Sequence, residues 1–250
     1  MRLLSFLVGM AAAFGAAGLS AQTTPARPAA PPPPPAIEAE NVWNLDLSTG
    51  GRVSIQLRPD VAPAHVERIK TLTRQGFYNG QVFHRVIEGF MAQSGDPTGT
   101  GNGGSPLPDL NAEINGLPHL RGAVAMARAQ ELNSANSQFY IMFVPRLSMD
   151  RSYTVVGRVV SGMSLVDAIE RGEPPVAPTR IVRASIGADN VAAMSAEELR
   201  AAAAQMASSA PGTATANGPA ASLGPPVPPP PSEPRELEPV RSPQARPPRG

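Results

Sequence analysis

The sequence predicts a mainly β fold: a closed eight-stranded antiparallel β-barrel, capped by two helices and flanked by disordered proline-rich ends. Of the 30 prolines, 20 lie before residue 38 or after residue 210, so the ends lack the composition of a packed core. Between them, eight short strand-like segments follow one another with only two helical patterns in between. That order is typical of a barrel with helices over its ends and not of parallel βαβ units.

Residues 1–21 are predicted to be a signal peptide. Arg2 supplies the positive charge, residues 3–19 are apolar, and small side chains favour cleavage after Ala21. The alternative is an uncleaved anchor, since the apolar stretch approaches the length that spans a bilayer. The stretch is rich in Ala and Gly, which favours cleavage. We therefore expect an exported protein without a membrane attachment, located in the periplasm if the source is a Gram-negative bacterium.

Residues 22–37 are predicted to be a linker, because five consecutive prolines at positions 31–35 favour an extended polyproline II spacer. The folded domain is expected over residues 38–190. It opens with two alternating segments, 41–47 and 52–57, whose Ser-Thr-Gly-Gly connection is typical of a β-hairpin.

A helix is predicted over residues 60–76, with Asp60 near its N-cap, Pro63 in its first turn and Gly76 at its end. Its apolar stripe consists of Val66, Ile69 and Leu72. The second helical pattern covers residues 162–172. The remaining predicted strands are 82–87, 90–93, 123–127, 138–143, 155–160 and 179–186.

Two segments follow the domain. Residues 191–206 are expected to form a short Ala-rich helix, in which Ser195 and Glu198 make a capping box. Residues 207–250 are predicted to be a disordered Pro- and Ala-rich tail.

Composition excludes several classes of function. A net charge of +1 and the absence of any Lys or Arg run argue against nucleic-acid binding. Without cysteine the chain has no disulfide, thiolate nucleophile or zinc–sulfur site. The three histidines, at positions 65, 84 and 119, lack the paired spacing of metal ligands, so no metal is expected. The glycine-rich segment 99–104 is not followed by a helical pattern, which argues against a phosphate loop.

One segment is far more specific. Residues 83–96 read FHRVIEGFMAQSGD and closely resemble the signature of cyclophilins, the peptidyl-prolyl cis–trans isomerases. Three further blocks agree in the same order: GAVAMA at 122–127, NSQFYI at 136–141 and YTVVGRV at 153–159. The resemblance covers about residues 38–188. It implies isomerisation of X–Pro bonds in unfolded or exported polypeptides, by a monomer that needs no cofactor.

The residues suit this reaction. An X–Pro bond isomerises slowly because twisting it destroys amide resonance, at a barrier of roughly 18–20 kcal/mol. No bond breaks, so a fixed donor that binds the twisted prolyl nitrogen is enough for catalysis. The resemblance gives this role to Arg85, whose guanidinium stays protonated, and gives Gln93 the substrate carbonyl. The alternative for Arg85 is an ordinary salt-bridged arginine on a strand.

The resemblance also supplies a substrate-binding surface. It places Phe90, Met91, Tyr140 and Met149 around the pyrrolidine ring. Phe90 and Met91 are adjacent and would face opposite sides of an ideal strand, so a bend at Gly89 is expected. Three rim residues complete the set, of which the first two pair with the peptide chain and the third supplies a hydroxyl: Ala127, Arg128 and Tyr153.

Three positions depart from the pattern of many eukaryotic cyclophilins: Ser148 replaces Trp, Tyr153 replaces His, and Arg128 replaces a common Asn. Loss of the indole removes a large contact and its N–H donor, so we expect weak binding of cyclosporin-type inhibitors.

The alternative function is a chaperone or scaffold that binds proline peptides with little turnover.

Overall fold

The computed structural model describes residues 37–209. The predicted signal peptide (1–21), all of the predicted linker except residue 37, and the tail beyond residue 209 lie outside the described residues. Within the described part, no helix has the length and apolar character needed to cross a membrane.

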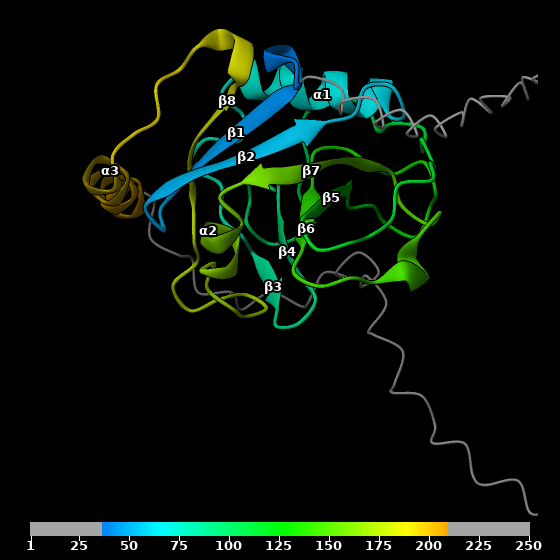
Figure 1. Cartoon of the computed structure of the whole chain (residues 1–250). Coiled ribbons are helices and arrows are strands. Elements are labelled where there is room, and N and C mark those ends of the chain that lie inside the picture. Colours follow the sequence, from blue (N-terminus) through cyan, green and yellow to red (C-terminus); the bar gives the residue numbers. More distant parts are fainter. Residues whose placement is uncertain (1–36, 210–250) are drawn as a thin grey trace, which may run out of the picture. The chain divides into compact units, whose positions relative to one another are not determined.

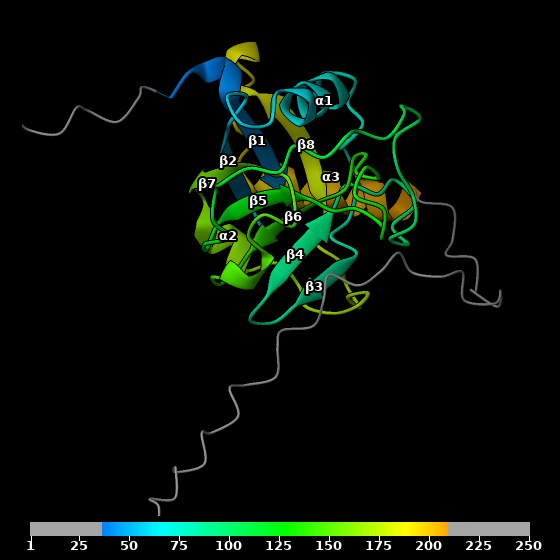
Figure 2. The same ribbon diagram turned by 90° about the vertical axis from the view of Figure 1, so that its right-hand side faces the viewer.

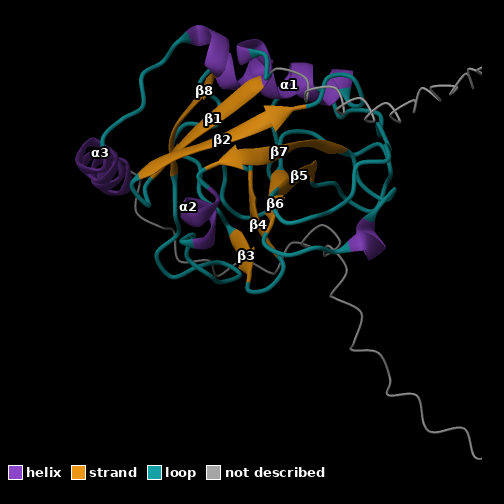
Figure 3. Cartoon of the chain, viewed as in Figure 1, coloured by secondary structure: helices purple, strands orange, loops and turns teal. Residues whose placement is uncertain are grey.

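Eight antiparallel strands form one sheet in the order β3-β4-β6-β5-β7-β2-β1-β8 (Figures 1 and 3). All eight predicted strands are present, several of them shorter than expected. The predicted hairpin is β1 and β2, in which Leu47 pairs with Gly51 at the turn. The bounds are β1 Val42–Leu47, β2 Gly51–Leu57, β3 Arg85–Ile87, β4 Met91–Ser94, β5 Ala123–Met126, β6 Phe139–Met142, β7 Val155–Ser161 and β8 Ile181–Ile186.

The predicted closure of the barrel is not confirmed, because the sheet is an open, curled half-barrel whose edge strands are β3 and β8. The physical reason is the brevity of β3 and the use of its outer edge by a loop. Val86 exchanges two backbone hydrogen bonds with Gly172, of 2.8 and 2.9 Å. Next to β8 the gap is spanned by an isolated bridge between Val82 and Arg180 and by backbone hydrogen bonds on either side of it, without a pairing of β3 with β8.

Helix α1 (Pro63–Arg74) lies against β8 and presents its predicted apolar stripe to the core (Figure 2). Its N-cap differs from the prediction. The cap residue is Ala62, without a side-chain bond, and Asp60 pairs with Arg58 instead. The carboxylate of Glu113 accepts the N–H groups of Ala64 and His65, both at 3.0 Å, and so satisfies the helix start from a distant loop.

The two other helices also differ in length from their predictions. Helix α2 (Met163–Asp167) is shorter than the predicted 162–172, because the chain turns after Asp167 to reach the edge of β3. Helix α3 (Ala196–Ser209) begins five residues later and ends three residues later than the predicted 191–206, and its capping box is confirmed. Ser195 N–H donates to Glu198 at 2.7 Å, and Glu198 N–H donates to the Ser195 hydroxyl at 3.2 Å.

The main core fills the concave side of the sheet beneath α1. Trp43 is fully buried there, and its ring meets Phe139 and Tyr78 edge-on or tilted at centroid distances of 4.8 and 5.1 Å. Such arrangements favour aromatic pairs beyond their buried area.

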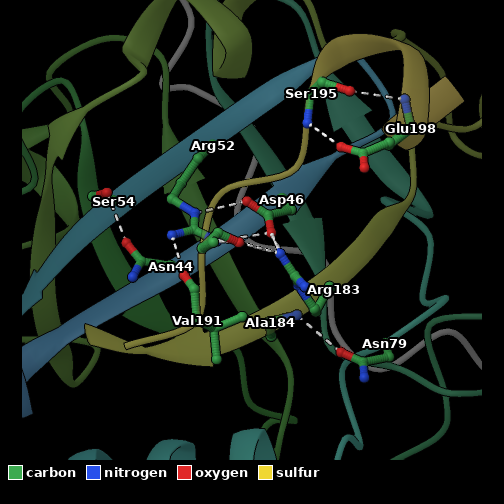
Figure 4. A network of polar contacts seen from close by, with 11 residues as sticks. Asn44, Asp46, Arg52, Ser54, Asn79, Arg183, Ala184, Val191, Ser195 and Glu198 are labelled. Carbon is green, nitrogen blue, oxygen red and sulfur yellow. Dashed lines mark hydrogen bonds and ion pairs between the residues drawn. The ribbon is translucent and has the colours of Figure 1, made fainter. Parts of the chain in front are cut away.

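An arginine–carboxylate cluster ties three strands together (Figure 4). Asp46 on β1 is 1% exposed and accepts hydrogen bonds from Arg52 on β2 and Arg183 on β8, at 2.7–3.1 Å. The same two guanidinium groups donate to the carbonyl groups of Val191 and Ala192. We call this the Asp46 cluster. It holds the segment that leads to α3 against the sheet.

Candidate active site

A second apolar cluster lies apart from the main core, and we call it the pocket cluster. It gathers side chains from β4 and the turn before it, from β5 and β6, and from the start of β7 and the segment that leads into it. All the apolar site residues that the sequence predicts belong to it. Its buried members are Phe90, Met91, Ala123, Ala125, Ala127, Tyr140, Met142, Met149, Tyr153 and Val155.

A bend brings Phe90 and Met91 into the same cluster. Gly89 has φ +64°, in the left-handed region that favours glycine. Phe90 therefore stands in the turn before β4, where its N–H donates to the carbonyl of Ile87 at 3.1 Å. Met91 begins the strand itself. The bend expected at Gly89 is present.

Arg85 and Gln93 are direct cross-strand partners on β3 and β4, so both side chains project from the same face of the sheet. The side chain of Arg85 is 21% exposed, and its Nε donates to Glu173 at 2.8 Å. Both terminal nitrogens of the guanidinium remain as donors. The salt-bridged alternative and a catalytic role are thus compatible, because the ion pair uses only one of the five N–H groups.

The amide of Gln93 is held by a neighbouring amide. Its Nε2 donates to Gln138 Oε1 at 2.8 Å, and Gln138 Nε2 donates to the carbonyls of Gly101 and Gly103, both at 2.8 Å. Gln93 keeps one N–H free, because a primary amide nitrogen carries two hydrogens. The glycine-rich segment that superficially resembles a phosphate loop therefore braces this amide pair.

Behind the cluster, a buried polar chain supports Tyr140. His119 Nε2 lies 3.0 Å from the Tyr140 hydroxyl, and His119 Nδ1 lies 2.9 Å from Asp150. A carboxylate only accepts, so Nδ1 carries the hydrogen of the neutral ring, and Nε2 accepts a hydrogen bond from the Tyr140 hydroxyl. Burial lowers the pKa of His119 against the opposing effect of Asp150, and burial raises the pKa of Tyr140. The imidazole is thus kept neutral.

Two arginines cover aromatic members of the cluster. The guanidinium of Arg128 lies 5.0 Å from the ring centre of Tyr153 and donates to the carbonyl of Ser152. Arg146 lies 5.9 Å from the ring centre of Phe90. Burial raises the pKa of Tyr153, while the charges of Arg128 and Arg85 oppose that shift. The guanidinium groups of Arg128 and Arg85 therefore both lie close enough to Tyr153 to act on its hydroxyl electrostatically.

The rest of the rim is short and open. Ser148, one of the three positions that depart from the eukaryotic cyclophilin pattern, is exposed in the single turn Leu147–Met149, while Met149 is buried. Among the described residues, no group of His, Asp and Glu side chains is arranged to hold a metal ion.

The family model of the cyclophilin type peptidyl-prolyl cis-trans isomerase/CLD matches residues 44–186, more than half of the chain. The chain belongs to the cyclophilin family of peptidyl-prolyl cis–trans isomerases. The match includes β1 from Asn44 onward, the other seven strands, α1, α2 and every residue of the pocket cluster.

Relatives of this cyclophilin agree with that assignment. A probable peptidyl-prolyl cis-trans isomerase of Brucella suis biovar 1 (strain 1330) is 48% identical over 170 residues, covering 62% of this chain and 86% of that protein. Peptidyl-prolyl cis-trans isomerase B of Bacillus subtilis (strain 168) is 38% identical over 129 residues, covering 51% and 89%.

Solved cyclophilin structures agree as well. AquaCyp293 from Hirschia baltica aligns with a TM-score of 0.57 and 28% identity, covering 62% of this chain and 77% of that one. A Cryptosporidium parvum cyclophilin, crystallised in the presence of the dipeptide Ala-Pro, aligns with a TM-score of 0.55 and 26% identity, covering 58% and 98%.

Sequence reasoning missed three residues at this cyclophilin site: Glu173, which pairs with Arg85; His119, which holds Tyr140; and Arg146, which covers Phe90. Glu173 is 88 positions from its partner in the sequence. For this pair the sequence offers one indication only, the expected approach of the first and last parts of the sheet in a closed barrel. For His119, the spacing of the histidines bears only on metal binding and does not indicate a hydrogen bond to a tyrosine.

Proposed function

We propose that this cyclophilin accelerates X–Pro isomerisation by donating a hydrogen bond from Arg85 to the prolyl nitrogen as the amide twists. The observation that carries the proposal is the cross-strand pair Arg85–Gln93 beside the pocket cluster. The nitrogen regains its lone pair only in the twisted state, so a donor fixed there binds that state better than the planar one. Neither a nucleophile nor a base is required.

The other residues take matching roles in this proposal. Phe90, Met91, Tyr140 and Met149 hold the pyrrolidine ring, and the free N–H of Gln93 holds the substrate carbonyl. The backbone at Ala127 and Arg128 pairs with the peptide on one rim, with Tyr153 beside it. An apolar surface suits the ring because proline has no N–H to satisfy.

Arg85→Ala tests the mechanism in a proline-limited peptide assay on the full chain. Removal of one preorganised donor at a reacting centre lowers kcat by about 100- to 1,000-fold. The free energy of unfolding should change by less than about 1 kcal/mol, because the ion pair with Glu173 is partly exposed. Arg158→Ala, at an exposed arginine on β7, is the matched control and should leave kcat unchanged. Full activity of Arg85→Ala would contradict the mechanism.

We further propose that the substrates are unfolded or newly exported polypeptides and that the protein acts as a monomer outside the cytoplasm. The support is the signal-peptide pattern of residues 1–21. Cell fractionation, with N-terminal sequencing of the mature protein, tests export. A mature chain that begins at Gln22 is expected. Recovery of the uncleaved chain, beginning at Met1, in the cytoplasmic fraction would contradict the proposal.

The second candidate is a chaperone or scaffold that holds proline peptides, which the solvent-open rim around Ser148 favours. Arg85→Ala separates the two functions. If the variant loses peptide turnover but still assists client folding normally, peptide binding is the main function. If turnover and client folding are both lost, isomerisation is the main function.

A further inference from the structure

We propose that Glu173 is a positioning residue of the isomerase, which orients the guanidinium of Arg85 by binding its Nε. The proposal rests on the role of Arg85 given above. Glu173 lies in the loop between α2 and β8, and its carboxylate accepts from Arg85 Nε at 2.8 Å. Glu173 itself does not belong to the pocket cluster.

The loop is attached to the strand that carries Arg85. Gly172 exchanges two backbone hydrogen bonds with Val86, the residue after Arg85. Gly172 has φ +144°, and a Cβ at that position would approach Pro175 Cα to 2.6 Å, so another residue would strain this bend. The backbone thus places Glu173 beside Arg85, independently of the ion pair.

A second attachment holds the loop through the residue before Gly172. The guanidinium of Arg171 lies 4.2 Å from the ring centre of Phe143, and its Nε donates to Glu88 at 2.7 Å. Phe143 N–H in turn donates to the carbonyl of Phe90 at 2.8 Å, which connects this attachment to the wall of the pocket cluster. Glu173 therefore directly follows two residues that are fixed by contacts with the β3–β4 hairpin and with Phe143.

Glu173 affects the orientation of the Arg85 guanidinium more than its electrostatic environment. An unrestrained arginine samples many rotamers, whereas a partner on Nε fixes the plane of the guanidinium and leaves both terminal nitrogens for substrate. The carboxylate of Glu173 is 51% exposed, so water screens much of its charge. A neutral acceptor of the same shape should therefore replace it, while a methyl group should not.

The experiment compares Glu173→Ala and Glu173→Gln in the full chain. We expect Glu173→Ala to lower kcat by about 3- to 10-fold, with KM changed by less than about twofold, because a misdirected donor weakens only the transition state. Glu173→Gln should keep more than about half of the activity, because its carbonyl still accepts from Nε. Equal losses in both variants would overturn the orientation argument.

Glu88→Ala is the matched control, because it removes the same kind of arginine–glutamate pair from the same loop without touching Arg85. Its kcat should equal that of the unmodified protein. If it loses as much activity as Glu173→Ala, the loop's attachment and not the orientation of Arg85 is responsible, and the proposal fails.

The double variant Arg85→Ala/Glu173→Ala decides whether Glu173 acts through Arg85. We expect no loss beyond that of Arg85→Ala alone, whereas multiplied losses would overturn the proposal. A slowly exchanging Arg85 Nε–H signal in NMR spectra should persist in Glu173→Gln and disappear in Glu173→Ala. If Arg85→Ala is inactive and Glu173→Ala fully active, only the role of Glu173 fails; if Arg85→Ala is fully active, both proposals fail.

Discussion

Arginine and carboxylate side chains meet in two regions of this cyclophilin, at the Asp46 cluster and beside the pocket cluster. Asp46 is buried and its oxygens accept four hydrogen bonds from two arginines, whose other donors bind backbone carbonyls. Glu173 is half exposed and accepts one bond, which leaves the terminal nitrogens of Arg85 available. In the first region both arginines are engaged in holding the fold, whereas in the second the terminal nitrogens of an arginine stay available, as the proposed role of Arg85 requires.

The largest effect should come from Asp46→Ala, which leaves two partly buried arginines without their carboxylate. We expect a loss of about 3 kcal/mol in the free energy of unfolding, with kcat unchanged where the variant is folded. Urea unfolding followed by the fluorescence of Trp43, the only tryptophan, measures it.

The control is Asp60→Ala, because Asp60 pairs with Arg58 and is 56% exposed. Its cost should be below about 1 kcal/mol. Similar losses at Asp46 and Asp60 would show that burial does not distinguish the two regions.

A gain of ligand affinity without a change of stability would sharpen the comparison on the pocket side. Ser148→Trp restores a large apolar contact and an N–H donor on the rim, so cyclosporin-type inhibitors should bind at least ~10-fold more tightly. Inhibition titrations of both proteins measure the gain. Nanomolar inhibition of the unmodified protein would contradict the expected role of Ser148.

Lowering the pH should affect stability through the pocket region as well, because His119 supports Tyr140 in the pocket cluster and is buried in its neutral form. Burial lowers the pKa values of His65, His84 and His119. The unfolded chain then binds more protons below about pH 6.5, so stability falls as the pH decreases, by up to about 1.4 kcal/mol per pH unit for each histidine. Urea midpoints at pH 7.5 and 5.5 test this, and a higher midpoint at pH 5.5 would refute it.

The smallest expected effect is that of pH on catalysis. In the proposed mechanism no side chain gains or loses a proton, and burial raises the pKa values of Tyr140 and Tyr153. The chemical step should therefore vary little between about pH 6 and 9. A kcat profile across that range measures it, and a bell-shaped profile centred near neutrality would indicate acid–base chemistry.

Local patterns predicted most of the fold. Alternation located the β1–β2 hairpin, helical spacing identified the buried face of α1, and the Ser195–Glu198 capping box marked the start of α3. These features depend on neighbours within a few residues, which a single sequence displays directly. The resemblance to cyclophilins then supplied the members of the pocket cluster, which spacing alone does not group.

Contacts between distant segments could not be predicted. Closure of the barrel was expected, but Gly172 occupies the edge of β3. The start of α1 is satisfied by Glu113 and not by Asp60, and Glu173 meets Arg85 across 88 positions of sequence. Each depends on how a loop returns to the sheet, and the local residue pattern carries no record of that path.

The strand order has a consequence for the synthesis of this protein. Strand β1 pairs with β2 on one side and with β8 on the other, where Trp43 pairs with Ile186. The second pairing of β1 therefore cannot form until the last strand has been synthesised. Pairing of such distant segments slows folding, because loop-closure entropy is lost before the contacts form. A nascent chain stopped before residue 181 would leave β1 with an open edge, which is a site for aggregation. This peptidyl-prolyl isomerase is thus itself a chain that must be nearly complete before its sheet can form.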